Sequence, residues 1–189
     1  MSKIFAISSL VVSVVLLFSV ASTANVPKVI DIPEQKTVQV EVKKLSNTTK
    51  EDIKCLADNI YFEARNQTIE GKIAVGRVVI NRVKDSRWPN TVCGVIKDAV
   101  YTTAWHDADI RVPVRHKCQF SWYCDGKSDT IDDLRSYEEA LTLARDIILN
   151  NRWDGIVHGA VFYHANYVSP KWRNSFDYVG RIDSHLFYR

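Results

Sequence analysis

The chain has 189 residues, of which 46% are hydrophobic and 25% are charged, and its formal net charge is +3. A single core typically organises about 100 to 200 residues, so this length suits one folded domain. A nucleic-acid-binding protein usually has a clustered basic face. Here the net charge is mild and the sequence shows no such basic cluster, so we expect no nucleic-acid partner.

The first residues have the pattern of a signal peptide. Lys3 precedes an apolar run over residues 4–20, and the small residues Ser22 and Ala24 follow the run. This pattern predicts a signal peptide over residues 1–24 and a periplasmic or secreted protein that does not contact the membrane after cleavage. The alternative is an uncleaved membrane anchor, although the run is short beside the roughly 20 apolar residues of a spanning helix.

A linker is predicted between the signal peptide and the folded domain. Residues 25–50 combine two prolines and many charges with little helical periodicity. Residues 51–189 then form the domain, and we expect it to be a monomer.

The four cysteines form an even set in a chain with an export signal, which favours disulfides. Three pairings are possible. Cys118 and Cys124 flank the short segment QFSWY, which a bridge would hold as a loop, and this pairing leaves Cys55 with Cys93. Zinc is the rival interpretation, but the spacing of the cysteines and of nearby His116 fits a four-ligand site poorly. We therefore expect no metal.

Helices are predicted at the start of the domain. The first follows a cap at Thr49, and its apolar residues recur at helical spacing up to Ile60. The second covers residues 69–83 and is mostly apolar, so it is expected to be buried. A short third helix is expected after a cap at Asn90 or Thr91.

A fourth helix is predicted further along the chain. Ser136 and Glu139 have the spacing of a capping box at its start. The residues expected to face inward are Leu141, Ala144 and Ile148.

The remaining segments are predicted as a loop and short strands. Residues 98–117 lack periodicity and are predicted to form a long loop. Residues 119–126 are strand-like and end in a turn. After Gly155, segments rich in β-branched and aromatic residues alternate with glycine, proline and aspartate, which predicts short strands. The predicted fold class is α+β, with helices first and a small late β-sheet.

Glu63 is the candidate catalytic residue. It lies three residues after Ile60, so its carboxylate joins the apolar stripe near the end of the first helix. Burial and the negative end of the helix dipole both raise the pKa of a carboxyl group. A glutamate shifted in this way can act as a general acid, as glycosidases require. The alternative is a structural ion pair of Glu63 with Arg65 or Arg77.

Several motifs, in order, resemble a known family. They are YFEARNQTIEGKIAVGRVVINRV, WPNTVCGVI, CQFSWYCDG, FYHANYVSPKW and HLFYR. Together they are similar to the catalytic domain of the spore cortex-lytic enzyme (SleB-type) family of cell-wall hydrolases, over nearly all of the chain from Cys55 to Arg189. The resemblance implies a lysozyme-like fold related to lytic transglycosylases, with Glu63 as the catalytic acid. It also implies that peptidoglycan glycan strands are the partner. No P-loop or dinucleotide-binding fingerprint appears in the sequence, so we expect no cofactor. Relatives usually have glycine where this chain has Asn66, a residue that tolerates a left-handed turn.

The chemistry then depends on whether a second carboxylate is present. Two-carboxylate glycosidases need one across the scissile bond, and the sequence offers only Asp107, Asp125 and Glu70 as weakly marked candidates. A lytic transglycosylase needs a single glutamate, so we favour cleavage of the MurNAc–GlcNAc bond by that route. The alternatives are a hydrolytic muramidase, an inactive peptidoglycan-binding module, and a structural protein that does not contact glycan.

Polar and aromatic residues that stand together in two segments are the candidate glycan-binding residues. They are Gln119, Ser121 and Trp122 in the first segment, and His164, Tyr167 and Trp172 in the second. In addition, Tyr163 or Tyr167 could position the glutamate or stabilise developing positive charge.

Overall fold

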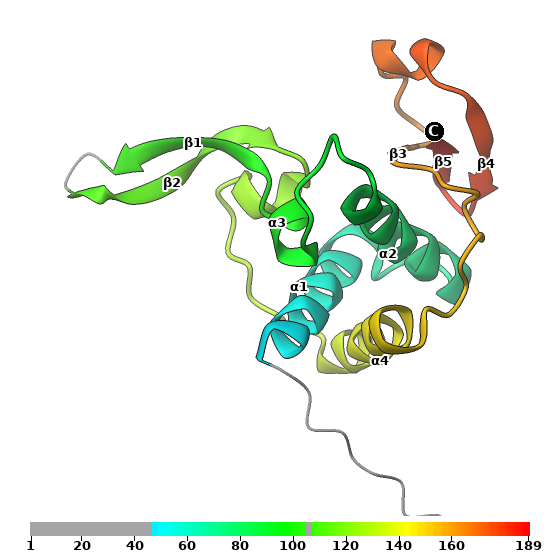
Figure 1. Ribbon diagram of the computed structural model, residues 1–189, viewed down its shortest axis with the longest axis horizontal. Helices are drawn as coiled ribbons and strands as arrows, with labels where there is room; N and C mark the ends of the chain where they lie inside the picture. Colours follow the sequence, from blue (N-terminus) through cyan, green and yellow to red (C-terminus); the bar gives the residue numbers. More distant parts are fainter. Residues whose placement is uncertain (1–46, 105–106) are drawn as a thin grey trace, which may run out of the picture. The chain divides into compact units, whose positions relative to one another are not determined.

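The computed structural model describes residues 47–104 and 107–189. Within these residues, four α-helices form the helical part: α1 (Asn47–Ala64), α2 (Ile69–Lys84), α3 (Val92–Ile96) and α4 (Leu134–Asn150) (Figure 1). The remaining elements are strands β1 (Ala99–Ala104), β2 (Asp107–Cys118), β3 (Phe162–Ala165), β4 (Tyr178–Ile182) and β5 (His185–Tyr188), with the 3-10 helices η1 (Ser121–Cys124) and η2 (Lys171–Ser175). The α+β fold class predicted from the sequence is confirmed.

Helix α1 is the centre of the helical part and packs against α2, α3 and α4. Its apolar stripe, including Leu56 and Ile60, is fully buried. The helix begins at Asn47, so Thr49 lies inside it and is not its cap. The last four residues of the predicted linker, 47–50, therefore belong to a helix, whereas the predicted signal peptide and the rest of the linker lie outside the described residues.

Helix α2 is buried along most of its length because it has apolar residues on two sides. Ile73 and Val79 pack into the core that α2 shares with α1 and α4, while Ala74 and Val78 pack against Phe187 of β5. The helix therefore separates two hydrophobic clusters, and its buried character agrees with the sequence prediction.

Helix α4 begins at Leu134, two residues before Ser136, where the predicted capping box starts. Asp133 is its N-cap, and the Asp133 carboxylate accepts hydrogen bonds from the Ser136 backbone N–H (3.0 Å) and hydroxyl (2.5 Å). Glu139 pairs instead with Lys72 of α2. The buried positions are Ala140, Leu143, Ala144 and Ile147, so the predicted inward residues Leu141 and Ile148 lie at the edge of the core.

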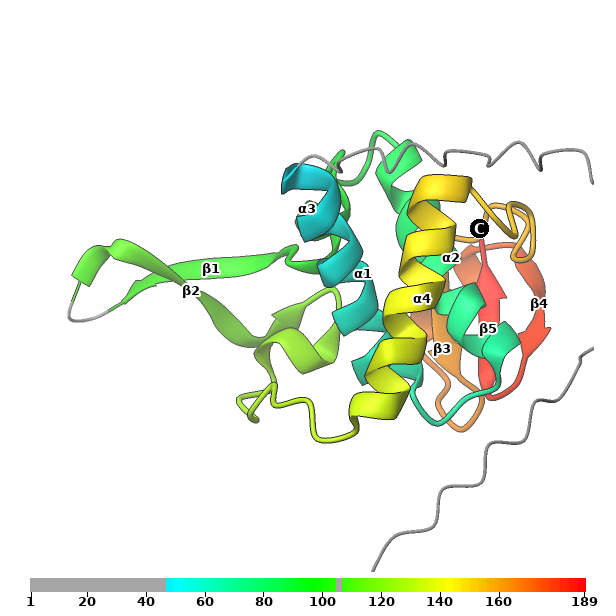
Figure 2. The ribbon, with the colours of Figure 1, turned by 90° about the horizontal axis from the view of Figure 1, so that it is seen from below.

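Strands β1 and β2 form a β-hairpin where the sequence analysis predicted a long loop over residues 98–117, so that prediction was wrong. Strands β1 and β2 pair antiparallel, with Thr102 opposite Val112 and Thr103 opposite Arg111. The hairpin extends away from the helices in both views (Figures 1 and 2). Many side chains on both of its faces are exposed, including Val100, Ile110 and Val112. Without one buried face, the alternating pattern that identifies a strand is not imposed on the sequence.

The disulfides are Cys55–Cys93 and Cys118–Cys124, as the sequence favoured. The second bridge explains why residues 119–126 are not a strand. Six residues in extended conformation span about 20 Å, whereas the two Cα atoms are 6.2 Å apart, and the enclosed chain forms the 3-10 helix η1 instead.

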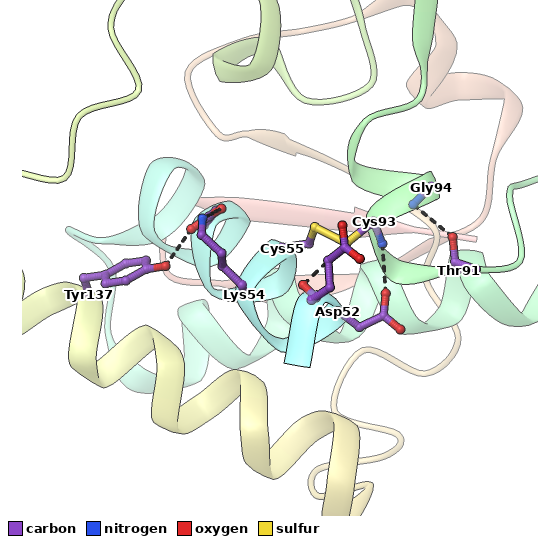
Figure 3. Close-up of a disulfide and its surroundings, with 9 residues drawn as sticks. Asp52, Lys54, Cys55, Thr91, Cys93, Gly94 and Tyr137 are labelled. Atoms are coloured by element: carbon purple, nitrogen blue, oxygen red, sulfur yellow. Dashed lines mark hydrogen bonds and ion pairs between the residues drawn. A yellow bond between two sulfur atoms is a disulfide. The ribbon is translucent and has the colours of Figure 1, made fainter. Parts of the chain in front are cut away.

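The first disulfide attaches the short helix α3 to α1 (Figure 3). Asp52 supports this attachment, because its carboxylate accepts a hydrogen bond of 3.3 Å from the Cys93 backbone N–H. Thr91, one of the two predicted caps, is the N-cap of α3, and its hydroxyl accepts a hydrogen bond from the Gly94 N–H at 3.1 Å. All four cysteines are therefore engaged in disulfides, which leaves none to bind zinc.

The late strands form a three-stranded antiparallel sheet in the order β3–β5–β4. The turn between β4 and β5 is attached to the turn between α1 and α2. The Asp183 carboxylate accepts hydrogen bonds from the Thr68 backbone N–H (2.8 Å) and hydroxyl (2.6 Å), and the Ser184 hydroxyl donates to Gln67 Oε1 (2.7 Å). These contacts fix the sheet against the chain that follows Glu63. Among the described residues, no helix has the length and apolar character to cross a membrane.

Candidate active site

A pocket of about 330 Å³ lies where the end of α1, the middle of the chain and strand β3 meet. Its lining combines one carboxylate, a guanidinium, two imidazoles and several polar and aromatic groups. The lining residues are Glu63, Arg82, Cys118, Gln119, Phe120, Ser121, Tyr163, His164, Ala165, Tyr167, Val168 and His185. Residues more than 100 positions apart in sequence therefore share one pocket.

Glu63 lies in the last turn of α1, with its carboxylate in the pocket. Desolvation by the surrounding protein raises the pKa of this carboxyl group. Two smaller effects lower the pKa: a hydrogen bond of 3.1 Å from the Tyr163 hydroxyl to Glu63 Oε2, and the positive charge of Arg82. The net shift is upward, so Glu63 retains a proton at higher pH than an exposed glutamate does.

The alternative partners considered for Glu63 are engaged elsewhere. The exposed Arg65 lies over the Tyr61 ring at 5.2 Å from its centroid. Arg77 pairs with Asp154 and donates to Asn151 Oδ1 at 2.9 Å. Neither arginine forms an ion pair with Glu63, so the structural ion pair that the sequence left open is wrong.

Tyr163 of β3 is placed rigidly beside the catalytic candidate. Its ring contacts those of His185 and Phe187 on the neighbouring strand β5, with centroids 5.2 and 5.8 Å away. Burial and the nearby Glu63 raise the pKa of Tyr163 well above its usual value. The hydroxyl therefore stays protonated and serves as a hydrogen-bond donor. The sequence analysis named Tyr163 as one of two candidates for positioning the glutamate.

Arg82 and His185 are charged or titratable pocket residues that the sequence analysis missed. Arg82 is held in place by several contacts. Its Nε donates a hydrogen bond of 2.7 Å to the Val161 carbonyl, and its guanidinium lies 4.3 Å from the centroid of the Trp88 ring. Only 5% of the residue is exposed. The sequence did contain a signal for this residue, namely an arginine on a helix that is predicted to be mostly apolar and buried.

Four of the six predicted glycan-binding residues line this pocket: Gln119, Ser121, His164 and Tyr167. Gln119, Ser121 and Tyr167 are exposed, and Tyr167 most strongly, at 84%. His164 is buried, with Nδ1 at 2.8 Å from the Ala165 carbonyl and Nε2 at 3.0 Å from the Tyr188 hydroxyl. Its ring nitrogens are therefore occupied by the fold.

The two predicted tryptophans are not among the pocket-lining residues. Trp122 stacks on Phe62, with ring centroids 4.7 Å apart, and its Nε1–H donates to Asn59 Oδ1 at 3.0 Å. Trp172 packs in an aromatic cluster with Phe162, His164 and Tyr188, each at a centroid distance of 5.6 Å. Both indoles are packed against other rings, a role that sequence spacing does not distinguish from sugar stacking.

The three candidates for a second carboxylate do not line the pocket. Asp125 accepts a hydrogen bond of 2.8 Å from the Lys127 backbone N–H, and Asp107 accepts one of 2.9 Å from the Asp109 N–H. Glu70 lies in the first turn of α2, where the helix dipole stabilises its charge. Among the residues that the structure describes, Glu63 is the only carboxylate of this pocket. Asn66, after Glu63, is not among the residues with positive φ, so the left-handed turn considered for it is not formed.

The fold is that of a known class of catalytic domains. The catalytic domain of the germination-specific lytic transglycosylase SleB from Bacillus anthracis superposes with a TM-score of 0.54. It has 24% sequence identity, and the match covers 78% of this chain and 98% of that domain. The catalytic domain of the Bacillus cereus SleB protein gives a TM-score of 0.52, also at 24% identity, with 78% and 94% covered. This likeness establishes the α+β fold.

The chain belongs to the Cell Wall Hydrolase family, whose model matches residues 66–188. Similar curated proteins are spore cortex-lytic enzymes. The one from Bacillus subtilis (strain 168) is 26% identical over 138 residues, which cover 72% of this chain and 37% of the relative. The one from Bacillus cereus is 27% identical over 139 residues, or 74% and 44% of the two chains. The aligned part thus spans less than half the length of these relatives. Glu63 lies three residues before the segment that matches the family model.

Proposed function

We propose that this protein is a peptidoglycan-cleaving enzyme that breaks the MurNAc–GlcNAc glycosidic bond as a lytic transglycosylase. The observation that carries the proposal is the Glu63 carboxyl group, which is desolvated and hydrogen-bonded yet lines a pocket. Membership of the Cell Wall Hydrolase family and similarity to spore cortex-lytic enzymes support a cell-wall substrate. Export by the predicted signal peptide would place the enzyme outside the cytoplasm, in the periplasm or the medium.

In the proposed reaction Glu63 acts first as an acid and then as a base. Its proton passes to the glycosidic oxygen, and the bond from this oxygen to C1 of the muramic acid breaks. The resulting carboxylate then takes the proton of the C6 hydroxyl of the same sugar, whose oxygen bonds to C1. The products are a free sugar hydroxyl and an anhydro-muramyl end, and no water is consumed. A raised pKa suits the first step because the acid must hold its proton near neutral pH.

The lytic route is favoured over hydrolysis by the composition of the pocket. A two-carboxylate glycosidase places its second carboxylate across the scissile bond. Glu63 is the only carboxylate among the described lining residues, and a lytic transglycosylase needs one. Gln119, Ser121 and Tyr167 are the accessible polar groups that we propose to bind the sugar, with Tyr163 positioning Glu63. Their exposure and their place beside Glu63 support this assignment.

The test compares the wild type with Glu63→Gln on purified sacculi. We expect the wild type to release soluble muropeptides whose ends lack one water by mass spectrometry. Glu63→Gln should remain folded and release at least about 100-fold less, because a general acid typically contributes 10²–10⁴-fold. Undiminished release by this variant would refute the role of Glu63, and hydrated ends would indicate a muramidase.

The second candidate is a binding module that holds glycan in the same pocket without cleaving it. The accessible polar lining of the pocket is compatible with such a role. In that case the wild type and Glu63→Gln would both sediment with sacculi, and neither would release products. Failure to sediment and to cleave would favour a structural protein.

A further inference from the structure

Arg82 carries a buried positive charge that Glu63 and Asp98 stabilise electrostatically but with which neither carboxylate forms an ion pair. It is 95% buried, given its exposure of 5%. Of its guanidinium nitrogens, Nε is bonded to the Val161 carbonyl, whereas one terminal nitrogen, Nη1, is buried without any hydrogen-bond partner. In the part of the chain that the structure describes, no ion pair includes Arg82.

Arg77 on the same helix shows how this fold accommodates a buried arginine. Arg77 is 1% exposed, and its charge is paired with Asp154 and further held by Asn151. One atom of Arg77, Nε, also lacks a hydrogen bond, but the charge itself has a counterion. The fold thus gives Arg77 an ion pair, whereas Arg82, just over one helical turn further along α2, has only the electrostatic influence of Glu63 and Asp98.

The guanidinium of Arg82, which has no ion pair, lies at the pocket that contains Glu63. Arg82 lines this pocket, and the Trp88 ring under the guanidinium restricts how its plane can turn. A second lining residue, His185, also has a buried ring nitrogen without a partner. Buried charges normally have a partner because leaving one uncompensated is costly. We therefore look for the missing hydrogen-bond partner of Arg82 Nη1 in the ligand of the pocket.

We propose that Arg82 binds an acyl oxygen of the muramoyl residue whose glycosidic bond lies at Glu63. The inference rests on the proposed function. A guanidinium prefers oxygen acceptors such as carboxylates and carbonyls and can contact them with two N–H groups. The muramoyl residue carries two groups with such acyl oxygens: the acetamido group at C2, which is next to C1, and the lactyl group, which is joined to C3 through an ether oxygen. Arg82 would make the enzyme selective for acylated glycan and orient C1 toward the carboxyl group.

Binding is measured with the cleavage-silent Glu63→Gln protein and peptide-free glycan strands, by calorimetry. Adding Arg82→Gln should weaken binding about tenfold or more, because a hydrogen bond to a charged group is lost. Adding Arg82→Lys should give an intermediate loss, since the charge stays but the fork is removed. Arg77→Lys is the matched control: it alters a buried arginine of the same helix outside the pocket and should leave affinity unchanged.

A ligand series, measured with and without Arg82→Gln, distinguishes the two acyl groups. Chitin oligosaccharides keep the acetamido group alone, chitosan oligosaccharides lack both groups, and peptide-free glycan strands have both. If the acetamido oxygen is the partner, Arg82→Gln weakens binding of chitin oligosaccharides as well. If the lactyl oxygen is the partner, the substitution affects only the muramoyl strands.

Two results would overturn the inference while leaving the proposed function intact. One is a folded Arg82→Gln or Arg82→Lys protein that binds glycan strands as tightly as its parent. The other, decisive even if both variants fail to fold, is equal affinity of the parent for acylated and chitosan strands. By contrast, a wild type that releases no product, with a Glu63→Gln protein that binds no glycan, would refute the proposed function itself.

Discussion

At the scale of single residues, the pocket balances opposing effects on one carboxyl group. Burial raises the pKa of Glu63, while the Tyr163 hydroxyl and the Arg82 charge lower it. An acid that must donate a proton and then accept one benefits from an intermediate proton affinity. The positions of Tyr163 and Arg82 therefore bear directly on the rate and on its dependence on pH.

Tyr163→Phe tests this balance. Removing the hydroxyl removes a hydrogen bond that stabilises the carboxylate, so the pKa of Glu63 rises further. The donating form of Glu63 is protonated, and activity falls as pH rises through its pKa. The falling limb of kcat/KM against pH should thus move to higher pH, and kcat/KM at its optimum should drop about tenfold.

A matched control for Tyr163→Phe exists outside the pocket. The Tyr137 hydroxyl donates to the Asp58 carboxylate at 2.7 Å, so Tyr137→Phe breaks a similar tyrosine–carboxylate bond. This variant should leave the pH profile where it is. A profile of Tyr163→Phe that stays in place, or moves to lower pH, would contradict the assignment.

At the scale of elements, the two disulfides close loops of different length and constrain different parts of the fold. Cys55–Cys93 spans 38 residues and joins two helices, whereas Cys118–Cys124 spans 6 and shapes η1. Cys118 also lines the pocket, so the shorter bridge is tied to the site. Loop-closure entropy grows with the length of the closed loop, which makes the longer bridge the greater contributor to stability.

Replacing each cysteine pair with alanine separates stability from activity. Loss of the 38-residue bridge should lower the free energy of unfolding by about 4 kcal/mol, and loss of the 6-residue bridge by about 2 kcal/mol. Urea unfolding measures both. The second variant should lose more activity under conditions in which both proteins are folded. Equal activity losses in the folded state would show that the shorter bridge does not shape the pocket.

At the scale of the whole molecule, the hairpin and the helical part have different relations to the core. The β1–β2 hairpin packs mainly on itself and on η1, whereas α1 packs against the other three helices and α2 against the other helices and β4. The described residues of β1 and β2 are absent from both hydrophobic clusters. The hairpin should therefore add little to the cooperative stability of the domain.

Shortening the hairpin tests this division. Because Thr102 pairs with Val112, residues 103–111 can be replaced by Asn-Gly, a two-residue connection suited to a hairpin. We expect Tm, followed by circular dichroism, to change by no more than about 4 °C. Loss of a single cooperative transition would instead show that the hairpin belongs to the folding unit.

The sequence by itself determined those features that depend on the spacing of residues within one segment. Helical periodicity located α1, α2 and the stripe that carries Glu63, and the six-residue spacing of Cys118 and Cys124 favoured their bridge. Asp133 replaced Ser136 as a cap because both residue types are good caps and packing selects between them.

Only the tertiary structure decided which distant residues meet. Arg82, Gln119 and Tyr163 join Glu63 because α2, the η1 loop and β3 converge there, and no local pattern records that convergence. It also decided that Trp122 and Trp172 pack against other rings and that β1 and β2 pair as strands. Side-chain burial and strand pairing depend on contacts between segments far apart in the chain, which periodicity within a segment does not encode.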